Sequence, residues 1–163
     1  MTADAEQPLL ALFGQLGIAA RTHAHAPAFT VEQGNAVWAE IPGIHCKNLF
    51  LKDAKARLWL VVAPVERRID LKRLPEVIGS ARLSFGSAEL LGEVLGIAPG
   101  SVTPFALIND SARRVSLVLD SWMMEQALVN FHPLRNDMTT TVTPADLRRF
   151  LAHTGHIPDV VSL

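Results

Sequence analysis

The sequence has 163 residues, a length typical of one well-filled domain, and 49% of them are hydrophobic, which excludes a disordered chain. A formal net charge of −1 argues against a protein that wraps a long duplex, although a local basic patch could still grip one end of a nucleic acid. The single cysteine excludes an internal disulfide and a cysteine-based zinc cluster. Because no stretch resembles a signal peptide or reaches membrane-spanning length, we expect a cytoplasmic protein with one domain over residues 1–163 and no membrane partner.

The first part of the chain predicts two helices and a short strand. Apolar residues recur at spacings of three and four in residues 4–18, where Asp4 can cap an amphipathic helix. Residues 20–25 alternate weakly and predict a short strand. Thr30 begins a near capping box, which predicts a second helix that continues through Trp38.

A hairpin follows, formed by residues 45–52 and 58–63 around a turn at residues 53–56. Because side chains alternate along a strand, Lys47 and Asn48 are expected to point to opposite faces of the sheet. Lys47 lies on the line of a core-facing row where that row meets solvent. A lysine there needs an anionic partner or a route to water, and a side chain that only extends its charged end into solvent is the alternative.

The second half of the chain mixes helices with hairpin-spaced strands. Asp70 is expected to cap a helix that runs to Ile78, and Ser87 a helix that runs to Leu95. The remaining expected elements are strands at 106–108, 115–119, 127–131 and 138–142, a helical turn at 120–125, and a last helix from Thr143 to about His153. The first two of these strands are expected to form a hairpin. This order, without a strict βαβ repeat, predicts an α+β fold with a mixed, largely antiparallel sheet flanked by helices.

One loop with unusual composition precedes an apolar run. Gly100 and Pro104 bracket Ser101, Val102 and Thr103. Glycine lets the backbone approach a ligand, and the three bracketed amides could converge on an oxygen that becomes negative during acyl transfer. An ordinary turn punctuated by glycine and proline is the alternative.

A second polar loop lies between two predicted strands. It contains His132, Arg135, Asn136 and Asp137 within six residues. Loops held by a rigid sheet commonly carry function, so this loop could orient a substrate. The alternative is a polar turn with the asparagine and aspartate at the tight bend.

Familiar catalytic motifs are absent from the sequence. There is no Gly-x-Ser-x-Gly elbow, Walker loop or Gly-x-Gly-x-x-Gly, which argues against these routes to ester hydrolysis, nucleotide hydrolysis and hydride transfer. Cys46 is expected to be structural. His23 and His25 have no third ligand nearby, so we expect two surface side chains and no metal.

Four segments occur in an order and spacing that match a known family: Lys47-Asn-Leu-Phe-Leu, Arg82-Leu-Ser-Phe-Gly, Gly100-Ser-Val-Thr-Pro, and Phe131-His-Pro-Leu-Arg-Asn. Together they resemble the YbaK/prolyl-tRNA synthetase-associated editing domain family, and most closely its freestanding ProXp-ala (PrdX-type) branch. The resemblance covers nearly the whole chain. It implies a single α+β domain with a curved mixed sheet that hydrolyses the ester bond of a mischarged tRNA, with alanyl-tRNA(Pro) as the substrate and no cofactor.

The resemblance also implies roles for residues in the pocket. Lys47 matches a lysine that steadies the terminal adenosine and its phosphate, and the loop at residues 100–104 matches one that holds the aminoacyl group by backbone contacts. His132 matches a pocket histidine, and Asn48 lies beside the lysine. The attacking water is implied to be helped by a ribose hydroxyl of the substrate itself, which agrees with the absence of a recognisable nucleophile.

The resemblance further implies a contact between Arg82 and the acceptor end of the tRNA. This role also suits a set of basic neighbours, namely Arg67, Arg68, Lys72 and Arg73. The expected partners are therefore the tRNA(Pro) acceptor end and, transiently, prolyl-tRNA synthetase, with no DNA. Two alternatives stay open: a deacylase for another mischarged tRNA such as cysteinyl-tRNA(Pro), and a non-catalytic module that binds tRNA or a synthetase.

Overall fold

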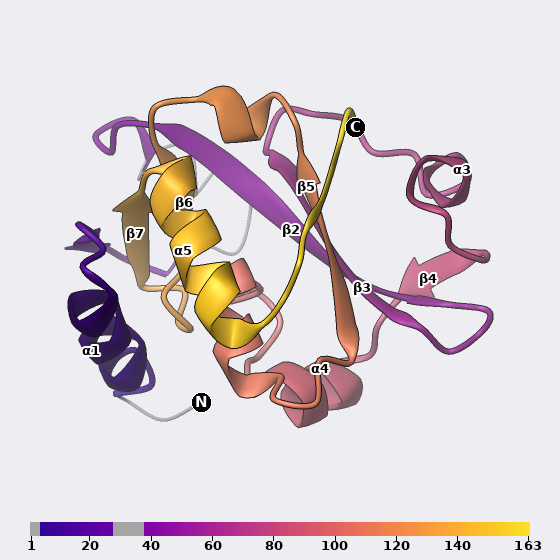
Figure 1. The fold of residues 1–163 in the computed structure, drawn as a ribbon, viewed down its shortest axis with the longest axis horizontal. Helices are drawn as coiled ribbons and strands as arrows, with labels where there is room; N and C mark the ends of the chain where they lie inside the picture. Colours follow the sequence, from indigo (N-terminus) through magenta and orange to yellow (C-terminus); the bar gives the residue numbers. More distant parts are fainter. Residues whose placement is uncertain (1–3, 28–37) are drawn as a thin grey trace.

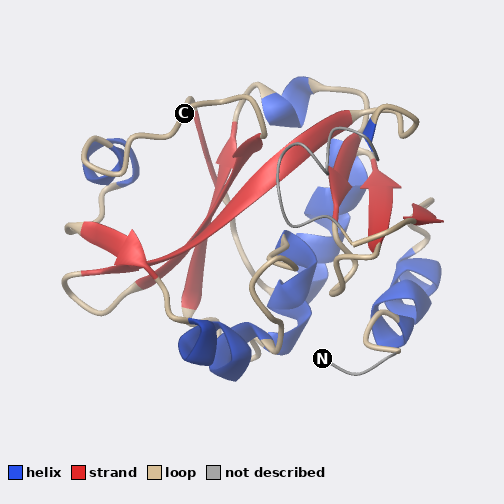
Figure 2. Cartoon of the chain, turned by 180° about the vertical axis from the view of Figure 1, so that it is seen from behind, coloured by secondary structure: helices blue, strands red, loops and turns tan. Residues whose placement is uncertain are grey.

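The computed structural model describes residues 4–27 and 38–163, and a mixed sheet organises this part of the chain (Figures 1 and 2). The strands of the 8-stranded sheet are β1 (Arg21–Ala24), β2 (Ile44–Asp53), β3 (Leu58–Pro64), β4 (Leu83–Phe85), β5 (Val115–Asp120), β6 (Val129–Phe131), β7 (Met138–Val142) and β8 (Asp159–Val161). The helices are α1 (Gln7–Leu16), α3 (Leu74–Ile78), α4 (Ala88–Leu95) and α5 (Pro144–Thr154), with two 3₁₀ helices, η1 (Pro104–Asn109) and η2 (Met123–Glu125). The α+β class with a mixed sheet is therefore confirmed.

Strand β2 is the longest strand and the centre of the sheet (Figure 1). The strand order is β1-β7-β6-β2-β3-β5-β8, and β4 pairs with β2 outside this path. Antiparallel pairs join β1 to β7, β7 to β6, and β2 to both β3 and β4, whereas β2–β6, β3–β5 and β5–β8 are parallel. Because β2 contacts three other strands, its side chains lie where the two halves of the sheet meet.

The hydrophobic core lies on both faces of the β2–β3 hairpin. On one face, α1, α4, α5 and η1 cover the larger cluster, in which Phe105 makes edge-to-face contacts with Phe13, Phe131 and Phe150. On the other face a smaller cluster contains Leu51, Trp59, Leu74 and Val118. Cys46 and Phe50 belong to the first face, and Leu49 and Leu51 to the second, which confirms the predicted alternation along β2.

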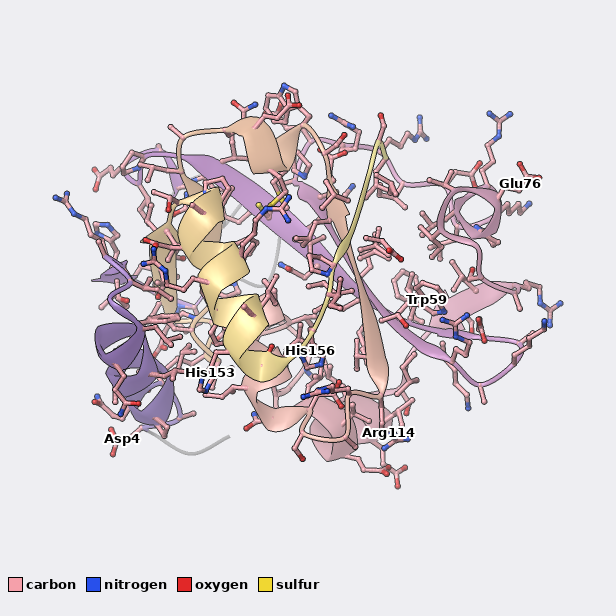
Figure 3. All side chains as sticks on the ribbon, viewed as in Figure 1. Asp4, Trp59, Glu76, Arg114, His153 and His156 are labelled. Carbon is pink, nitrogen blue, oxygen red and sulfur yellow. The ribbon has the colours of Figure 1, made fainter. Side chains whose placement is uncertain are left out.

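Buried polar groups connect the ends of the elements. The carboxylate of Asp110, which follows η1, lies 2.9 Å from Nε2 of His156, just beyond the end of α5 (Figure 3). The same carboxylate accepts hydrogen bonds from the amides of Arg114 and Val115, at 3.0 Å each. These contacts join η1, the start of β5 and the end of α5. Among the described residues, no helix has the length and apolar character needed to cross a membrane.

The predicted strand at residues 106–108 is wrong, because these residues belong to η1. Pro104 supplies a helical φ angle at the first position, and the Thr103 hydroxyl accepts a hydrogen bond from the Phe105 amide. The run is apolar because it is buried on all sides, and periodicity alone does not separate such a run from a strand. Strand β5 consequently pairs with β3, and no hairpin forms there.

Other helix starts differ by a few residues from the prediction. Helix α1 begins at Gln7 after Glu6, and α3 begins at Leu74. The Asp70 carboxylate accepts a hydrogen bond from the Lys72 amide in the turn before α3. The predicted caps at Ser87 and Thr143 are confirmed, while Thr30 and most of the helix that it was expected to open lie outside the described residues.

Candidate active site

Three hollows follow one another along β2. The first, here called the Trp122 cavity, has a volume of about 340 Å³ and lies beside the start of the strand. The second, the His132 hollow, has a volume of only about 20 Å³, and the third, the Gly100 groove, about 180 Å³. The Trp122 cavity is lined by Trp38, Ala39, Gly43, Ile44, His45, Pro64, Val65, Glu66 and Trp122. The His132 hollow is lined by Trp38, His45, Cys46, Asn48, Asn130, Phe131, His132 and Thr139. The Gly100 groove is lined by Asn48, Leu49, Phe50, Phe85, Gly86, Ala88, Leu91, Pro99, Gly100 and Val102.

Asn48 lies at the junction of the His132 hollow and the Gly100 groove, because it lines both. Its side-chain Oδ1 is buried and has no hydrogen-bond partner among the described residues. A buried acceptor without a donor costs free energy, and such groups in folded proteins commonly mark a place that a ligand or water completes. Asn48 is therefore prepared to accept a hydrogen bond from a molecule that enters either hollow.

His132 is held in one tautomer by the backbone. Its Nδ1 lies 2.8 Å from the Met138 carbonyl oxygen, and because a carbonyl only accepts, Nδ1 carries the proton. Burial lowers the pKa of His132 below its usual range, and the neighbouring His25 adds to this effect. At neutral pH the ring is uncharged, and Nε2 is its hydrogen-bond acceptor.

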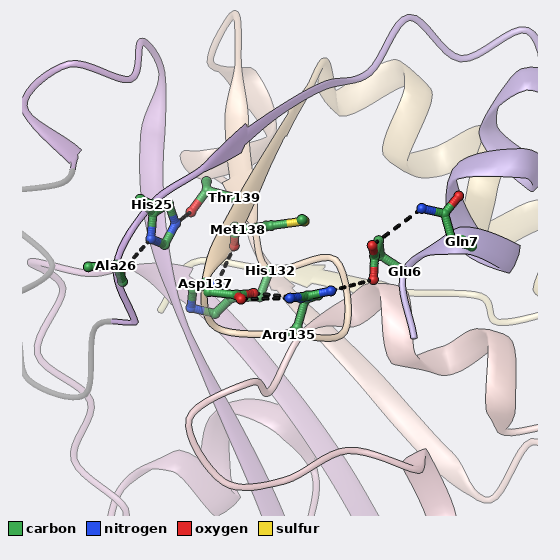
Figure 4. A network of polar contacts seen from close by, with 9 residues as sticks. All are labelled: Glu6, Gln7, His25, Ala26, His132, Arg135, Asp137, Met138 and Thr139. Carbon is green, nitrogen blue, oxygen red and sulfur yellow. Dashed lines mark hydrogen bonds and ion pairs between the residues drawn. The ribbon is translucent and has the colours of Figure 1, made fainter. Parts of the chain in front are cut away.

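His25 is a neighbour of the site that the sequence did not reveal. Its ring centroid lies 6.4 Å from that of His132 (Figure 4), and its Nε2 shares a 2.8 Å hydrogen bond with the Thr139 hydroxyl. We expected a surface side chain. The pairing of β1 with β7 brings His25, the residue after β1, beside His132, and no local pattern in the sequence indicates that pairing.

An ion-pair network fixes the loop that carries His132 (Figure 4). The Arg135 guanidinium donates to both carboxylate oxygens of Asp137, at 2.6 and 2.7 Å, and to Glu6 at 3.1 Å. The charge and hydrogen bonds of Arg135 lower the pKa of Asp137. Arg135 and Asp137, predicted as possible substrate-orienting groups, thus hold the loop to the segment that precedes α1.

The loop at residues 100–104 forms one side of the Gly100 groove. Gly100 has a φ of +93°, a left-handed conformation that favours glycine. The Ser101 amide donates to the Ala98 carbonyl at 3.1 Å, so it is already used within the loop. The amides of Val102 and Thr103 donate to no atom of the described residues, but of these two residues only Val102 lines the groove, because Thr103 is fully buried.

The Lys47 side chain lies on the face of β2 opposite to that of Asn48. Regular pairing of β2 with β3 preserves the alternation of side chains, and Lys47 lines none of the three hollows defined above. Partial burial lowers the pKa of Lys47. The structure thus brings Asn48, His132 and the Gly100 loop together and places Lys47 apart from them.

Cys46 is structural, as predicted. Burial raises the pKa of its thiol to about 12, and its Sγ lies 3.4 Å from the Met123 sulfur. A thiol with such a pKa supplies almost no thiolate at neutral pH. Among the described residues, no group of three or more histidine, cysteine or acidic side chains is placed to hold a metal ion.

The basic residues predicted to contact tRNA occupy two different environments. Arg82 is exposed at the start of β4, three residues before Phe85, whose side chain is 64% exposed at the Gly100 groove. Arg67 instead donates to the buried Asp120 carboxylate at 3.1 Å. The other three members of the predicted basic set are exposed, namely Arg68, Lys72 and Arg73. Arg82 is the member of this set that directly precedes β4, the strand whose Phe85 lines the Gly100 groove.

The chain is similar to known proteins over its whole length. Residues 25–150 match the family model described as the aminoacyl-tRNA editing domain. The chain is 35% identical to the prolyl-tRNA editing protein ProX of Acetoanaerobium sticklandii, covering 100% of both chains, and 36% identical to prolyl-tRNA synthetase associated domain-containing protein 1 of Danio rerio, covering 98% of this chain and 88% of the relative.

Solved structures share the same fold at low sequence identity. One, described as a proposed trans-editing enzyme for prolyl tRNA synthetase, has a TM-score of 0.73 at 18% identity and covers 100% of this chain and 99% of its own. Another, a hypothetical protein, has a TM-score of 0.73 at 22% identity, covering 96% of this chain and 100% of its own.

Proposed function

Because the chain belongs to the aminoacyl-tRNA editing domain family, in its ProX-type branch, we propose that it hydrolyses alanyl-tRNA(Pro) in trans and binds the aminoacyl ester between Asn48, His132 and the Gly100 loop. Family membership makes the chain a deacylase, a hydrolase that acts on mischarged tRNA. The tRNA(Pro) acceptor end is the proposed partner, with prolyl-tRNA synthetase as a transient one.

The observation that carries this proposal is the unpartnered Asn48 oxygen at the junction of two hollows. An aminoacyl-adenosine brings N–H and O–H donors directly beside its ester bond. If the ester lies at the junction, one of these donors satisfies Asn48, and the ester carbonyl faces the Gly100 loop. Binding then removes a desolvation cost that the free protein carries, which favours this one orientation.

The size of the His132 hollow supports alanine as the aminoacyl group. About 20 Å³ of free space fits one water-sized group, comparable to the methyl group of alanine. The ring of proline is larger and would overlap the wall. Since a hydrophobic pocket rejects a larger group by steric overlap far better than it rejects a smaller one, a hollow of this size protects correctly charged prolyl-tRNA.

The chemistry needs no covalent intermediate. Water attacks the ester carbonyl, the amide of Val102 stabilises the oxygen that becomes negative, and the bond to the ribose oxygen breaks as that oxygen takes a proton from the attacking water. A ribose hydroxyl of the substrate helps to orient the water, and Nε2 of His132 accepts a hydrogen bond at the same place. Free alanine and uncharged tRNA are the products.

Lys47 and Arg82 are proposed to bind the nucleic acid. Lys47 would contact the phosphate of the terminal adenosine from the other face of β2, and Arg82 would contact the acceptor stem near the Gly100 groove. A charge-assisted contact to phosphate strengthens binding and leaves the chemical step unchanged.

Deacylation assays test the function directly. Wild-type protein and Asn48→Ala are compared on tRNA(Pro) charged with alanine, cysteine or proline. We expect the wild type to prefer alanyl-tRNA(Pro), and Asn48→Ala to lose about 10- to 100-fold in rate, the equivalent of one hydrogen bond near a charged group. Equal wild-type rates on the alanyl and cysteinyl substrates would reject the alanyl preference. No turnover on any substrate would favour a binding module.

A further inference from the structure

The His132 hollow and the larger Trp122 cavity are separated by only two side chains. Of the residues that line each space, Trp38 and His45 are the two that line both. Their rings are stacked, with centroids 5.0 Å apart and planes inclined by 15°. On one side of this stack the free volume is about 20 Å³, and on the other about 340 Å³.

The stack is held in place by local contacts. Nε2 of His45 donates a hydrogen bond to the Ile41 carbonyl at 3.1 Å, and the Ile41 amide donates to the Trp38 carbonyl at 3.0 Å. The histidine is anchored in β2, whereas the tryptophan comes from the segment just before the strand. Burial also lowers the pKa of His45, so the ring is uncharged at neutral pH and stacks without a desolvated charge.

Three other walls of the hollow are backed by packed protein. Phe131 is 2% exposed and packs against Phe105, and Cys46 lies against Met123. The Asn130 amide nitrogen donates to the Pro42 carbonyl at 2.9 Å, which also fixes that wall. A larger aminoacyl side chain cannot enlarge the hollow in these directions without disturbing the core. Among the described residues of the wall, Asn48 borders the Gly100 groove, where the ester is proposed to lie, and the stacked rings are the wall with the Trp122 cavity behind them.

We propose that the Trp38–His45 stack is the steric gatekeeper of aminoacyl specificity, which keeps the hollow at alanine size by closing it off from the Trp122 cavity. This inference rests on the proposed function, because it assumes that the aminoacyl side chain enters the His132 hollow. Removing either ring joins the two spaces. The enlarged pocket would then admit prolyl and still larger apolar groups, while alanine continues to fit.

The test compares variants on a graded series of substrates. Trp38→Ala and His45→Ala each remove one ring, Trp38→Phe keeps a ring in the wall, and Trp122→Ala is the matched control, because Trp122 lines only the cavity behind the stack. Each protein is assayed on tRNA(Pro) charged with alanine, proline or leucine. The readout is the ratio of second-order rates for each larger group relative to alanine.

We expect Trp38→Ala and His45→Ala to raise the prolyl-to-alanyl ratio by at least about 10-fold, the scale of discrimination in hydrophobic pockets, with alanyl rates within several-fold of wild type. Trp38→Phe and Trp122→Ala should keep wild-type ratios. Trp38→Ala keeps every β2 side chain, so it tests the inference even if His45→Ala fails to fold. Wild-type ratios of rates in a folded Trp38→Ala protein would overturn the inference. An inactive wild type would instead reject the proposed function itself, so the two failures are distinguishable.

Discussion

At the scale of single residues, the site relies on neutral polar groups in defined orientations. Asn48 presents a buried oxygen without a partner, and His132 presents an uncharged ring whose Nδ1 proton is fixed by a backbone carbonyl. An ester bond is already activated, so orientation and a backbone amide can supply the acceleration without a nucleophile in the protein. The buried thiol of Cys46 is consistent with such a site.

The tautomer and pKa of His132 can be measured directly. Because the Met138 carbonyl binds Nδ1–H and burial disfavours the charged ring, NMR should show the Nδ1–H tautomer and a pKa below the ordinary value of 6.5. His132→Ala should slow deacylation. It should change the melting temperature little, since the residue lies in a loop.

An Nε2–H tautomer, or a His132 pKa above 6.5, would contradict the assignment of Nε2 as the acceptor. A large loss of thermal stability in His132→Ala would show that the residue is structural.

At the scale of elements, the loop between β6 and β7 is the part of the site that depends most on distant support. It carries His132, and Arg135 ties it both to its own Asp137 and to Glu6 before α1. The Glu6 side chain is only 4% exposed, so removing its partner would leave a carboxylate without its ion pair in a buried place. Helix α1 thereby contributes to the site without lining it.

Replacing the central cation of this network should loosen both contacts. Arg135→Gln should lower the melting temperature and slow deacylation, because the His132 loop loses its anchor. Arg149→Gln is the control: Arg149 also pairs with a carboxylate, that of Asp146, but it is 52% exposed, and exposed pairs contribute little. Equal melting temperatures for the two variants would contradict this role.

The ion pair between Arg135 and Asp137 predicts that thermal stability depends on pH. Arg135 holds the pKa of Asp137 below the ordinary value of 3.8, so the pair stabilises the fold fully above that value and is lost as the pH falls below it. The difference in melting temperature between wild type and Arg135→Gln should therefore be large at pH 6 and shrink at pH 3. Thermal unfolding followed by circular dichroism measures the melting temperatures of the two proteins at both pH values. A difference in melting temperature that does not change with pH would contradict the predicted loss of stability at low pH.

At the scale of the whole molecule, charge distribution indicates how a tRNA approaches. The net charge is −1, which argues against a protein that wraps a long duplex. The exposed Arg82 directly precedes β4, and the exposed ring of Phe85 on β4 lines the Gly100 groove. We therefore expect binding at the acceptor end, where few phosphates are contacted.

The salt dependence of tRNA binding measures how many phosphates the protein contacts. A log–log plot of binding constant against salt concentration should have a slope of roughly −2 to −4, scaled from the rule for each neutralised phosphate. Arg82→Ala should weaken binding and reduce the magnitude of the slope by about 1. Arg149→Ala, on α5, should leave the slope unchanged, and a wild-type slope in Arg82→Ala would show that Arg82 contacts no phosphate.

Features that depend on neighbouring residues could be predicted from the amino-acid sequence. The β2–β3 hairpin, the alternation of Lys47 and Asn48, and the caps at Ser87 and Thr143 all follow from contacts within a few positions along the chain. The four spaced segments also identified the family, because a combination of motifs in order is specific even where each one alone is weak. These features were predictable from local physics or from the resemblance.

Only the tertiary structure decided which side chains meet. Residues 106–108 became part of a 3₁₀ helix, His25 reached His132, and the Trp38–His45 stack closed a hollow of a particular size. Each outcome depends on strand pairs and packing between residues far apart in sequence. Burial and the free volume of a cavity are set by all the elements that surround it, so no local pattern encodes them.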